Sequence, residues 1–411
     1  MADFKAPKGT FDVVPPESGR YERLVGRFAD RVERAGYGLV IGPMFEEIGV
    51  FQRVGEATDI VRKEMYDFDD KGGRHMALRP ESTASVVRAF VQHRPVTPWK
   101  VWYVAPHFRY ENPQAGRYRQ HHSLGVEALG SEDPDLDVEV IALAWRFYAG
   151  LGVTRIRLDL TSLGDDQCRP AYRQLLLDYL ASKALCPEHE GRYQENPLRV
   201  LDCKKPACVA ATADAPFQVD NLCDPCTAHF ARVREGLDAL GIPYTLAPRL
   251  VRGLDYYTRT TFEFAAEALP PTQNAAGGGG RYDKLVEELG GPPTPGIGFG
   301  LGIERILLVC DAEAVFPAPG DNLDVFVIDT TGGTAARDIA EQLREAGVRT
   351  DRAFDQRSFK AQMKHALRSG AQFALVIEDA GWSLRTLIEK GEAETLDPAT
   401  AVDHVRKRLS A

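Results

Sequence analysis

The sequence predicts an α+β protein with more than one domain, and three observations carry this prediction. Residues 17–36 place apolar side chains at helical spacing. Residues 100–129 contain two extended runs around the turn-rich ENPQAG, which predicts an antiparallel hairpin with a long tip. Beyond a composition break at residues 316–322, strand and helix patterns alternate, so we expect a small separate domain with helices packed on a mainly parallel sheet.

Composition sets the class of protein. The chain has 411 residues, of which 44% are hydrophobic and 27% charged, and this length suggests about two to four domains. The N-terminus, MADFKAPKGT, has no apolar signal region, and no apolar run approaches a membrane span, so we expect a cytoplasmic protein with no membrane partner. The net charge of −9 argues against a generally basic surface, but a local basic stripe can still bind nucleic acid.

The first half of the chain carries the helix at 17–36, a broken strand and the hairpin. The apolar run YGLVIGPMFEEIGVF predicts a strand interrupted by Gly42 and Pro43. Arg109 lies on the outgoing strand of the hairpin and Arg117 follows its tip, and both suit phosphate contacts. One face of the returning strand carries His121, Ser123, Gly125 and Glu127.

The middle of the chain contains an irregular insertion and a tyrosine-rich strand entrance. Residues 135–185 predict mainly helices around the strand RIRLDL, and residues 186–235 become cysteine-rich and irregular. The segment LVRGLDYYTRTTFEF alternates like a strand only in its second half. Its first half gathers Arg252, Asp255, Tyr256 and Tyr257. LPPTQNAAGGGG then predicts a loop and RYDKLVEEL a short helix.

The segment GIGFGLGIER predicts a strand with one bare face. Its glycines, Gly296, Gly298, Gly300 and Gly302, recur at every second residue. A strand face without side chains lets a flat ligand lie against the backbone, and Arg305 near the following helix start can meet a phosphate. The spacing is not the dinucleotide fingerprint, and no phosphate loop occurs in the chain. A tightly packed strand with an exposed arginine is an equal alternative.

Each of these features also has a purely structural explanation. A Ser or Thr after Glu81 can cap a helix, hairpin arginines can be solvated surface charges, Arg252 can pair with Asp255, and tyrosines can be core residues. Taken together, the features predict a site for a small zwitterion and a nucleotide. In that site Glu81 and Thr83 offer acceptors for an ammonium group.

These segments together resemble the histidyl-tRNA synthetase family over almost the whole chain. FRYENPQAGRYRQHHSLGVEALG and GIGFGLGIER resemble the second and third motifs of class II synthetases, and the first helix with GYGLVIGPMFEE resembles the first motif. LVRGLDYYTRTTFEF and AGGGGRYDKLVEELGG resemble the two segments peculiar to the histidine enzyme.

The resemblance implies both a fold and a reaction. It implies an antiparallel catalytic sheet flanked by helices in residues 1–320, an insertion at about 168–235, and an anticodon-binding domain at residues 322–411. It implies ATP-dependent ligation of L-histidine to tRNA(His) through histidyl-adenylate, with Mg²⁺ accompanying ATP, by a cytoplasmic homodimer. It assigns no residue as a metal ligand.

Residue roles follow from the same resemblance. Arg109 and Arg252 would be catalytic and stabilise charge on the α-phosphate, and Arg109, Arg117 and Arg305 would bind ATP. The histidine site would be formed by Glu81, Thr83, Ser123, Glu127, Tyr256 and Tyr257. Glu127 and Tyr257 would each satisfy one nitrogen of the imidazole ring, so aliphatic amino acids should be excluded without editing.

Three positions depart from the family pattern. Ser123 stands where the family usually has glutamine, which puts its direct contact with the amino group in doubt. Asn112 stands where arginine is common, which weakens any expectation about reading the tRNA end. Lys284 replaces a common glycine.

The cysteine-rich region permits a structural zinc site. Cys203, Cys208, Cys223 and Cys226 form the pattern C-x4-C-x14-C-x2-C, with Cys186 and His189 just upstream. Four thiolates can close a zinc site, but the first pair is loosely spaced, so we favour reduced cysteines in a helical insertion over zinc. By resemblance, this insertion clasps the tRNA acceptor arm.

The C-terminal region carries a local basic excess. Residues 349–368 contain six cationic and two anionic side chains with Phe354 and Phe359 interleaved, a pattern that suits stacking against splayed bases. The structural alternative is a solvated helix face with core phenylalanines.

Two other functions are considered. One is a non-catalytic regulatory paralogue that controls the ATP phosphoribosyltransferase of histidine biosynthesis. The other is a class II synthetase for a different amino acid. The RGLDYY segment and the retained arginines favour the histidine ligase over both.

Overall fold

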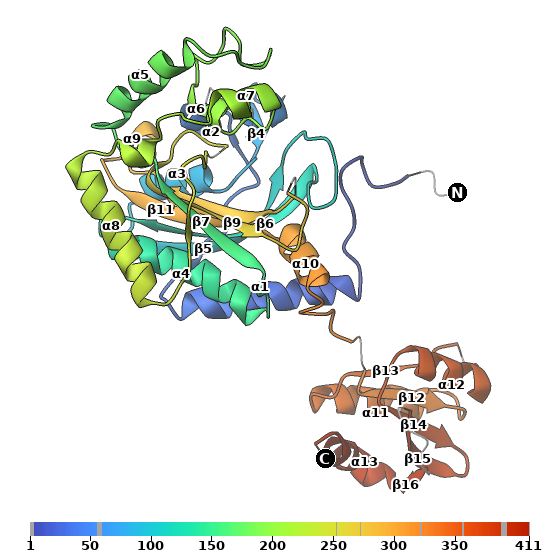
Figure 1. Ribbon diagram of the computed structural model, residues 1–411. Helices are drawn as coiled ribbons and strands as arrows, with labels where there is room; N and C mark the ends of the chain where they lie inside the picture. The colour runs from blue at the N-terminus through green and yellow to red at the C-terminus, as the bar shows by residue number, and fades with distance from the viewer. Residues whose placement is uncertain are drawn as a thin grey trace. The chain divides into compact units, whose positions relative to one another are not determined.

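The computed structural model describes residues 4–55, 60–251, 253–271, 273–320, 323–355, 357–387 and 393–410. The chain divides into two compact units, one of residues 1–12 and 21–317 and the other of residues 13–20 and 318–411. Each unit has its own sheet and its own apolar core (Figure 1).

An eight-stranded sheet forms the centre of the larger unit, in the order β1-β5-β6-β11-β10-β9-β7-β8 (Figure 1). The strands between β5 and β7 in this order are antiparallel, and the edge strands β1 and β8 are parallel to their neighbours. The strands are β1 (Gly38–Leu39), β5 (Trp99–Phe108), β6 (Gln120–Leu129), β7 (Ile156–Ser162), β8 (Thr245–Leu246), β9 (Thr258–Ala266), β10 (Ala275–Arg281) and β11 (Gly296–Gly302). The antiparallel hairpin and the antiparallel sheet expected from the sequence are therefore confirmed.

Helices cover both faces of this sheet. One face packs against α1 (Glu17–Glu33), α4 (Pro134–Gly150), α8 (Asp224–Ala239) and α10 (Ile303–Ala312). The other face packs against α2 (Gly49–Gly55), α3 (Thr83–His93) and the short α9 (Leu285–Glu288). The helical spacing of residues 17–36 correctly predicts α1, whose Leu24, Phe28 and Val32 are fully buried.

The broken strand predicted after α1 is only partly correct. β1 has two residues, and the chain next pairs as β2 (Phe45–Glu47) in a small antiparallel sheet with β4 (His75–Leu78) and β3 (Tyr66–Asp69). Proline has no N–H for a ladder, which explains why pairing stops near Pro43. The last part of the run forms α2, and a π-helical turn follows at Ile60–Glu64.

The prediction of a glycine-rich loop before the short helix is wrong for the last residues of the segment. Ala275–Arg281 is the central strand β10, which lies between β9 and β11. A Cβ at Gly279 would overlap the carbonyl oxygen of Gly298, so only glycine permits this close approach of two backbones. A strand without side chains has no alternation, and for this reason the sequence pattern did not reveal it.

The insertion, residues 168–235, leaves the sheet after β7 and returns before β9. Its elements are α5 (Arg169–Leu180), α6 (Leu198–Leu201), α7 (Pro206–Ala211), a 3-10 turn (Gln218–Asp220) and most of α8. A small core of its own joins α5 to the irregular part through Leu176, Cys186, Val200 and Cys208.

The smaller unit is a five-stranded sheet in the order β13-β12-β14-β15-β16. Its strands are β12 (Val325–Asp329), β13 (Thr350–Arg352), β14 (Phe373–Glu378), β15 (Gly381–Thr386) and β16 (Glu394–Leu396), and its helices are α11 (Thr334–Glu345), α12 (Phe359–Arg368) and α13 (Ala401–Leu409), with a 3-10 turn at Pro398–Thr400. The first three strands are parallel, as expected, and the last two add antiparallel strands that the sequence analysis missed.

Within the described ranges of both units, no helix is long and apolar enough to cross a membrane.

Candidate functional site

The candidate site is built on the neighbouring strands β6 and β11. In their register, Glu127 is opposite Gly298, and Ser123 is opposite Gly302. The alternate residues of β6, such as Leu124 and Val126, are fully buried in the core on the other face. The period-two alternation therefore places the polar residues of β6 and the glycines of β11 on the same face of the sheet.

The glycine face of β11 is bare only at one end. A Cβ at Gly296 would overlap the ring of Tyr282, and one at Gly298 would overlap the carboxylate of Glu127. At Gly300 and Gly302, no atom would lie closer than 3.9 Å to an added Cβ. The expected surface for a flat ligand is therefore limited to the Gly300–Gly302 end, because protein side chains already fill the other end.

Glu127 is the most enclosed acid of the site, with no exposed surface. Its carboxylate accepts hydrogen bonds from Thr83 Oγ1 at 2.8 Å, from Tyr103 at 3.4 Å and from the hydroxyl of Tyr282. Burial raises the pKa of Glu127 to about 8, although the hydrogen bonds from Tyr282 and Thr83 act in the opposite direction. The negative charge of Glu81 raises it further.

Glu81 caps helix α3 and faces the same site. Its carboxylate accepts from the backbone N–H of Thr83 at 2.5 Å and of Ala84 at 2.9 Å, so it meets the positive end of the helix. Burial raises the pKa of Glu81, against the opposing effect of these hydrogen bonds and of Arg109. The alternative of a Ser or Thr cap is wrong, because Ser82 caps nothing and contacts His107 Nε2 at 2.7 Å.

The two tyrosines at the entrance of β9 are buried beside these acids. The rings of Tyr256 and Tyr257 lie 4.6 Å apart, and Tyr256 lies 5.8 Å from Tyr282. Burial, followed by the neighbouring Tyr257 and Glu81, raises the pKa of Tyr256 well above its usual value, so this phenol keeps its proton. Arg252, and with it the suggested Arg252–Asp255 pair, lies outside the described residues.

A cavity of about 220 Å³ brings the predicted cations together. Arg109, Arg117, Ser123 and Arg305 all line it. Arg305 donates to the carbonyls of Gly116 at 3.1 Å and Ala275 at 2.6 Å, so it ties the hairpin tip to β10. The remaining lining residues are Glu111, Gly116, Tyr118, His121, Ala275, Ala276, Gly277, Gly302 and Glu304.

Glu81 and Glu127 with the neighbouring phenols, which we call the acidic pocket, lie next to the cationic cavity. Ser123 and Glu127 lie on the same face of β6, and Arg109 Nε donates to the carbonyl of Pro80 at 2.9 Å, next to Glu81. One end thus offers two carboxylates and several phenols, and the other offers three guanidinium groups. This arrangement suits a ligand that is positive at one end and joined to a polyanion at the other.

Several residues of the site were missed by the sequence analysis. Tyr103 is opposite Gly125 in the β5–β6 register, where the absence of a side chain leaves room for its ring. Tyr282 lies within the quoted RYDKL, and its proximity to Glu127 comes only from the β10–β11 pairing. His121, which the sequence analysis placed on the same face as Ser123, also lines the cavity. Burial, followed by the charge of Arg109, lowers the pKa of His121 to about 3, so it is a neutral imidazole.

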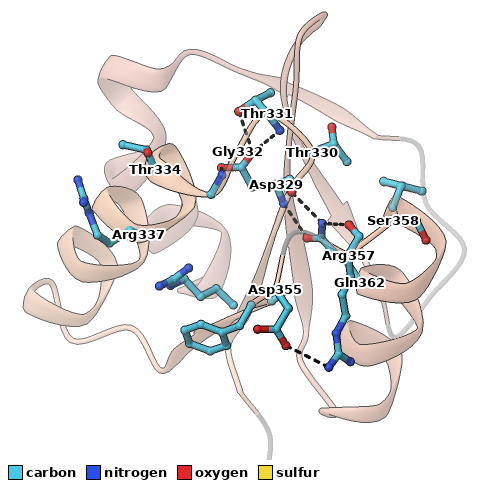
Figure 2. A pocket seen from close by; sticks show the side chains of 15 residues that line it. Asp329, Thr330, Thr331, Gly332, Thr334, Arg337, Asp355, Arg357, Ser358 and Gln362 are labelled. Atoms are coloured by element: carbon cyan, nitrogen blue, oxygen red, sulfur yellow. Dashed lines mark hydrogen bonds and ion pairs between the residues drawn. The ribbon is translucent and has the colours of Figure 1, made fainter.

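The smaller unit has a cavity of its own, of about 770 Å³, between the end of β12 and the start of α12 (Figure 2). Gln362 braces it by donating to the carbonyls of Asp329 at 2.7 Å and of Arg357 at 2.6 Å. At the mouth, Arg352 lies 4.3 Å above the ring of Phe354, whose side chain is 56% exposed. The expected basic and aromatic surface therefore exists at this edge, while Phe359 packs into the core.

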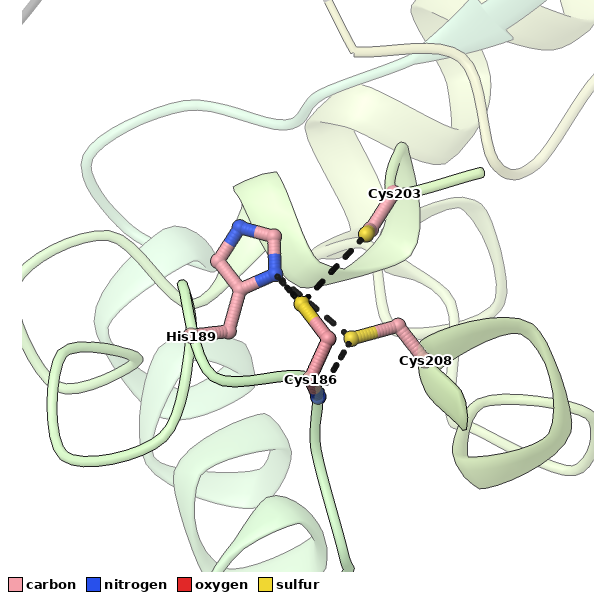
Figure 3. A group of neighbouring side chains, drawn as sticks. All are labelled: Cys186, His189, Cys203 and Cys208. Atoms are coloured by element: carbon pink, nitrogen blue, oxygen red, sulfur yellow. Dashed lines mark hydrogen bonds between the residues drawn. The ribbon is translucent and has the colours of Figure 1, made fainter. Parts of the chain in front are cut away.

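The four cysteines considered as one zinc site lie in two separate groups. Cys203 and Cys208 lie with Cys186 and His189 (Figure 3), while Cys223 and Cys226 lie with Asp165 and Cys168. The pairing expected from spacing is wrong because α7 and the turn after it carry Cys208 away from the start of α8.

Comparison with known proteins finds a matching family model for each of the two units. The family model for histidyl-tRNA synthetase matches residues 9–306, and the model for the anticodon binding domain matches residues 324–408. The chain is 48% identical over 410 residues to the histidine–tRNA ligase of Rhodococcus erythropolis, with 97% of each chain covered. It is 46% identical over 414 residues to that of Moorella thermoacetica, covering 98% of this chain and 97% of the other. A crystal structure of apo S. aureus histidyl-tRNA synthetase superposes with a TM-score of 0.82 at 34% identity, covering 98% of this chain and 100% of the other.

Proposed function

This chain belongs to the histidyl-tRNA synthetase family, and from that premise we propose how its residues act. The chain is an aminoacyl-tRNA synthetase that uses ATP to ligate L-histidine to tRNA(His). The observation that carries the assignment of its site is the buried Glu127, held by phenols and Thr83, beside a cavity lined by arginines.

The acidic pocket binds histidine. Glu127 and Tyr257 hydrogen-bond the two imidazole nitrogens, and Glu81 and Thr83 receive the α-ammonium group. Support comes from Thr83, which donates to Glu127 through its hydroxyl and to Glu81 through its backbone N–H, so that the two carboxyl groups lie close together. A competing amino acid with an aliphatic side chain would leave the buried Glu127 without a new hydrogen-bond partner. The site should therefore reject such amino acids strongly.

The cationic cavity binds ATP. Arg305 and Arg117 meet the terminal phosphates, and Arg109 meets the α-phosphate. Mg²⁺ accompanies the phosphates, and the carboxylates of Glu111 and Glu304 at the cavity wall are donors of the type that this ion prefers.

The chemical step is an in-line displacement at the α-phosphorus. A carboxylate oxygen of histidine forms a bond to phosphorus while the bond to pyrophosphate breaks, which gives histidyl-adenylate. Arg109 and Arg252 stabilise the charge that develops on the phosphoryl oxygens. A hydroxyl of the tRNA terminal ribose then attacks the acyl carbon and releases AMP. The protein supplies position and charge rather than covalent chemistry.

The tRNA is bound by both units. We assign residues 1–320 to the catalytic domain, residues 168–235 to an insertion that contacts the acceptor arm, and residues 322–411 to the anticodon-binding domain. The insertion supports this role with a cavity of about 700 Å³ that is lined by Lys63, Arg192, Arg199, Lys204 and Lys205 among other residues. The exposed Phe354 supports it in the smaller unit.

A homodimer formed through the first motif accounts for an apolar surface. Leu39, Ile41, Met44 and Phe45 are all at least half exposed, and Ile41 is 86% exposed. A patch of this kind marks an interaction site more often than a free surface. Sedimentation of the full chain should give twice the mass of one chain.

The regulatory paralogue is the weaker alternative. Such a protein needs neither the histidine pocket nor the ATP cavity, whereas this chain keeps Glu127, Tyr257, Arg109 and Arg305 in place. A solved structure described as a regulatory subunit/histidyl-tRNA synthetase from Bacillus halodurans is 20% identical, and it shares the fold only.

Two assays test the proposal. Histidine-dependent exchange of pyrophosphate into ATP should occur, and charging of tRNA(His) should follow. Absence of both exchange and charging would indicate the non-catalytic paralogue, and exchange with another amino acid would refute the pocket assignment. Arg252→Ala should abolish adenylate formation while histidine binding stays measurable, and normal turnover in this variant would contradict its role.

A further inference from the structure

Four side chains of the insertion converge without any role in the reaction described above (Figure 3). The ligand atoms of Cys186, His189, Cys203 and Cys208 all lie within 4.8 Å of one another. Cys186 Sγ lies 3.4 Å from His189 Nδ1 and 3.9 Å from Cys203 Sγ, and Cys208 Sγ lies 3.5 Å from the same imidazole nitrogen. All four residues are far from Glu127 and Arg305 in the sequence, and none lines the ATP cavity.

These distances are those of a tetrahedron around zinc. With Zn–S bonds of about 2.3 Å and Zn–N bonds of about 2.0 Å, two ligands at the tetrahedral angle lie about 3.8 Å apart for a sulfur pair and about 3.5 Å apart for sulfur and nitrogen. The three observed separations lie close to these edges. A disulfide would need sulfurs about 2.05 Å apart, and all the cysteines are free.

The surrounding chain has little regular secondary structure. Between α5 and α8, the described helices have only four, six and three residues, and helices of this length are not stable on their own. The four ligands come from three separate pieces of chain: the turn at 186–189, the second residue after α6, and α7. A single ion would therefore fix the relative positions of all three pieces.

The protein environment favours metal binding by these four side chains. The backbone N–H of Cys186 donates to Cys208 Sγ at 3.3 Å, an orientation that stabilises a thiolate. Cys186 and Cys208 are buried, whereas His189 and Cys203 are half-buried and border the open cavity of the insertion, which provides a path for the ion. We propose that Cys186, His189, Cys203 and Cys208 bind a structural zinc ion.

The geometry points to a second, independent zinc site at the base of the insertion. Asp165, Cys168, Cys223 and Cys226 also place their ligand atoms within 4.8 Å of one another. Asp165 Oδ1 lies 3.6 Å from the sulfurs of Cys168 and of Cys223, and the sulfurs of Cys168 and Cys226 lie 4.0 Å apart. Arg259 lies 3.4 Å from Asp165 and offsets part of the negative charge that three thiolates and a carboxylate would keep around a divalent ion.

Metal analysis of the full-length protein tests both sites. After dialysis against metal-free buffer, we expect about two zinc ions per chain for the wild type and about one each for Cys203→Ser and Cys223→Ser, since each site closes with four ligands. The two variants serve as controls for each other. Glu190→Gln, which changes an exposed neighbour of His189, should keep both ions.

A more conservative variant and an absorption spectrum distinguish loss of metal binding from misfolding of the protein. His189→Asn changes a half-buried side chain, and it should lose one ion while pyrophosphate exchange continues, because the reaction site lies elsewhere. Cobalt-substituted wild-type protein should show the visible absorption of tetrahedral thiolate complexes, reduced but not lost in His189→Asn. Wild-type zinc well below one ion per chain would overturn both sites. Loss of zinc only in Cys223→Ser would overturn the first site, and loss only in Cys203→Ser would overturn the second.

Discussion

At the scale of single residues, burial of Glu127 makes the stability of the folded protein depend on pH. Its carboxylate is fully buried, and its pKa is raised to about 8. A carboxyl group in an unfolded chain has a pKa near 4.3. The folded state therefore binds more protons between about pH 4.3 and pH 8, so the contribution of Glu127 to stability falls as the pH rises through this window.

Histidine binding should have the opposite pH dependence. The ionised form of Glu127, to which we assign the hydrogen bond from the substrate, becomes the major form only above about pH 8. We expect the KM for histidine in pyrophosphate exchange to fall as the pH rises from 7 to 9, while the KM for ATP changes much less. A KM for histidine that rises over this range would contradict the assigned role.

Replacing Glu127 by glutamine should separate the two effects. Glu127→Gln removes the buried charge but keeps the shape, so we expect pyrophosphate exchange to fall by about 10²–10³-fold, as for loss of a key hydrogen-bonding group in a dry site. The same variant should unfold at a higher temperature than the wild type at pH 8.5, measured by calorimetry. An active variant of unchanged thermal stability would refute both points.

The sequence was sufficient to predict which residues with distinctive chemistry lie together. Ser123 and Glu127 lie on the predicted face of β6, Thr83 contacts Glu127, and Arg109, Arg117 and Arg305 line one cavity. Their roles in the reaction stay predictions. Tyr103 and Tyr282 could not be predicted, because an isolated tyrosine in a strand gives no signal until the register places it against a carboxylate.

At the scale of elements, the β6–β11 register decides which glycines matter. Gly298→Ala would push a methyl group into the carboxylate of Glu127, so we expect histidine activation to fall by at least about 10²-fold, equal to roughly 2.7 kcal/mol. Gly150→Ala at the end of α4 is the control, because no atom would lie within 4 Å of its added carbon. This control should keep its KM for histidine within about threefold of the wild type, a change of less than 1 kcal/mol. Equal damage in both variants would contradict the register argument.

A buried ion pair joins β10 to α4. Arg281 and Asp137 are both fully buried, with their charged atoms 2.7 Å apart. Asp137→Ala would leave the buried guanidinium group with only its longer ion pair to Asp283, at 3.3 Å, so we expect the free energy of unfolding to fall by about 3–5 kcal/mol. Asp30→Ala removes an exposed pair with Arg34 on α1 and should cost less than about 0.5 kcal/mol. Urea unfolding of the two variants measures the difference, and similar midpoints would refute it.

Elements with regular alternation were predictable, and those without it were not. The hairpin β5–β6, the glycine-faced β11 and the helix α1 follow directly from their patterns. β10 escaped prediction because a run of glycines has no side chains to alternate, and its strand conformation comes from the neighbouring strands. β15 and β16 escaped because their polar, half-exposed residues resemble a turn region.

At the scale of the whole molecule, kinetic measurements should distinguish the roles of the two units. A change in the smaller unit should alter the KM for tRNA but not pyrophosphate exchange. Phe354→Ala removes the exposed ring beside Arg352 in the smaller unit, and loss of one stacked base contact, about 1–3 kcal/mol, should raise the KM for tRNA by about 10-fold. Pyrophosphate exchange should not change. Leu367→Ala, equally exposed on α12 but away from the cavity, is the control. A comparable increase in the control would show that surface area rather than stacking matters.

The insertion leaves the catalytic sheet and returns to it at nearly one point. Ser162 at the end of β7 is opposite Thr260 in β9, and the sulfurs of Cys168 and Cys226 are only 4.0 Å apart. A genetic splice that exchanged residues 169–222 for another segment would therefore have to bridge only a short gap. The segment can therefore be exchanged, or a foreign binding module grafted at the same junction, without any change to the central strands of the sheet.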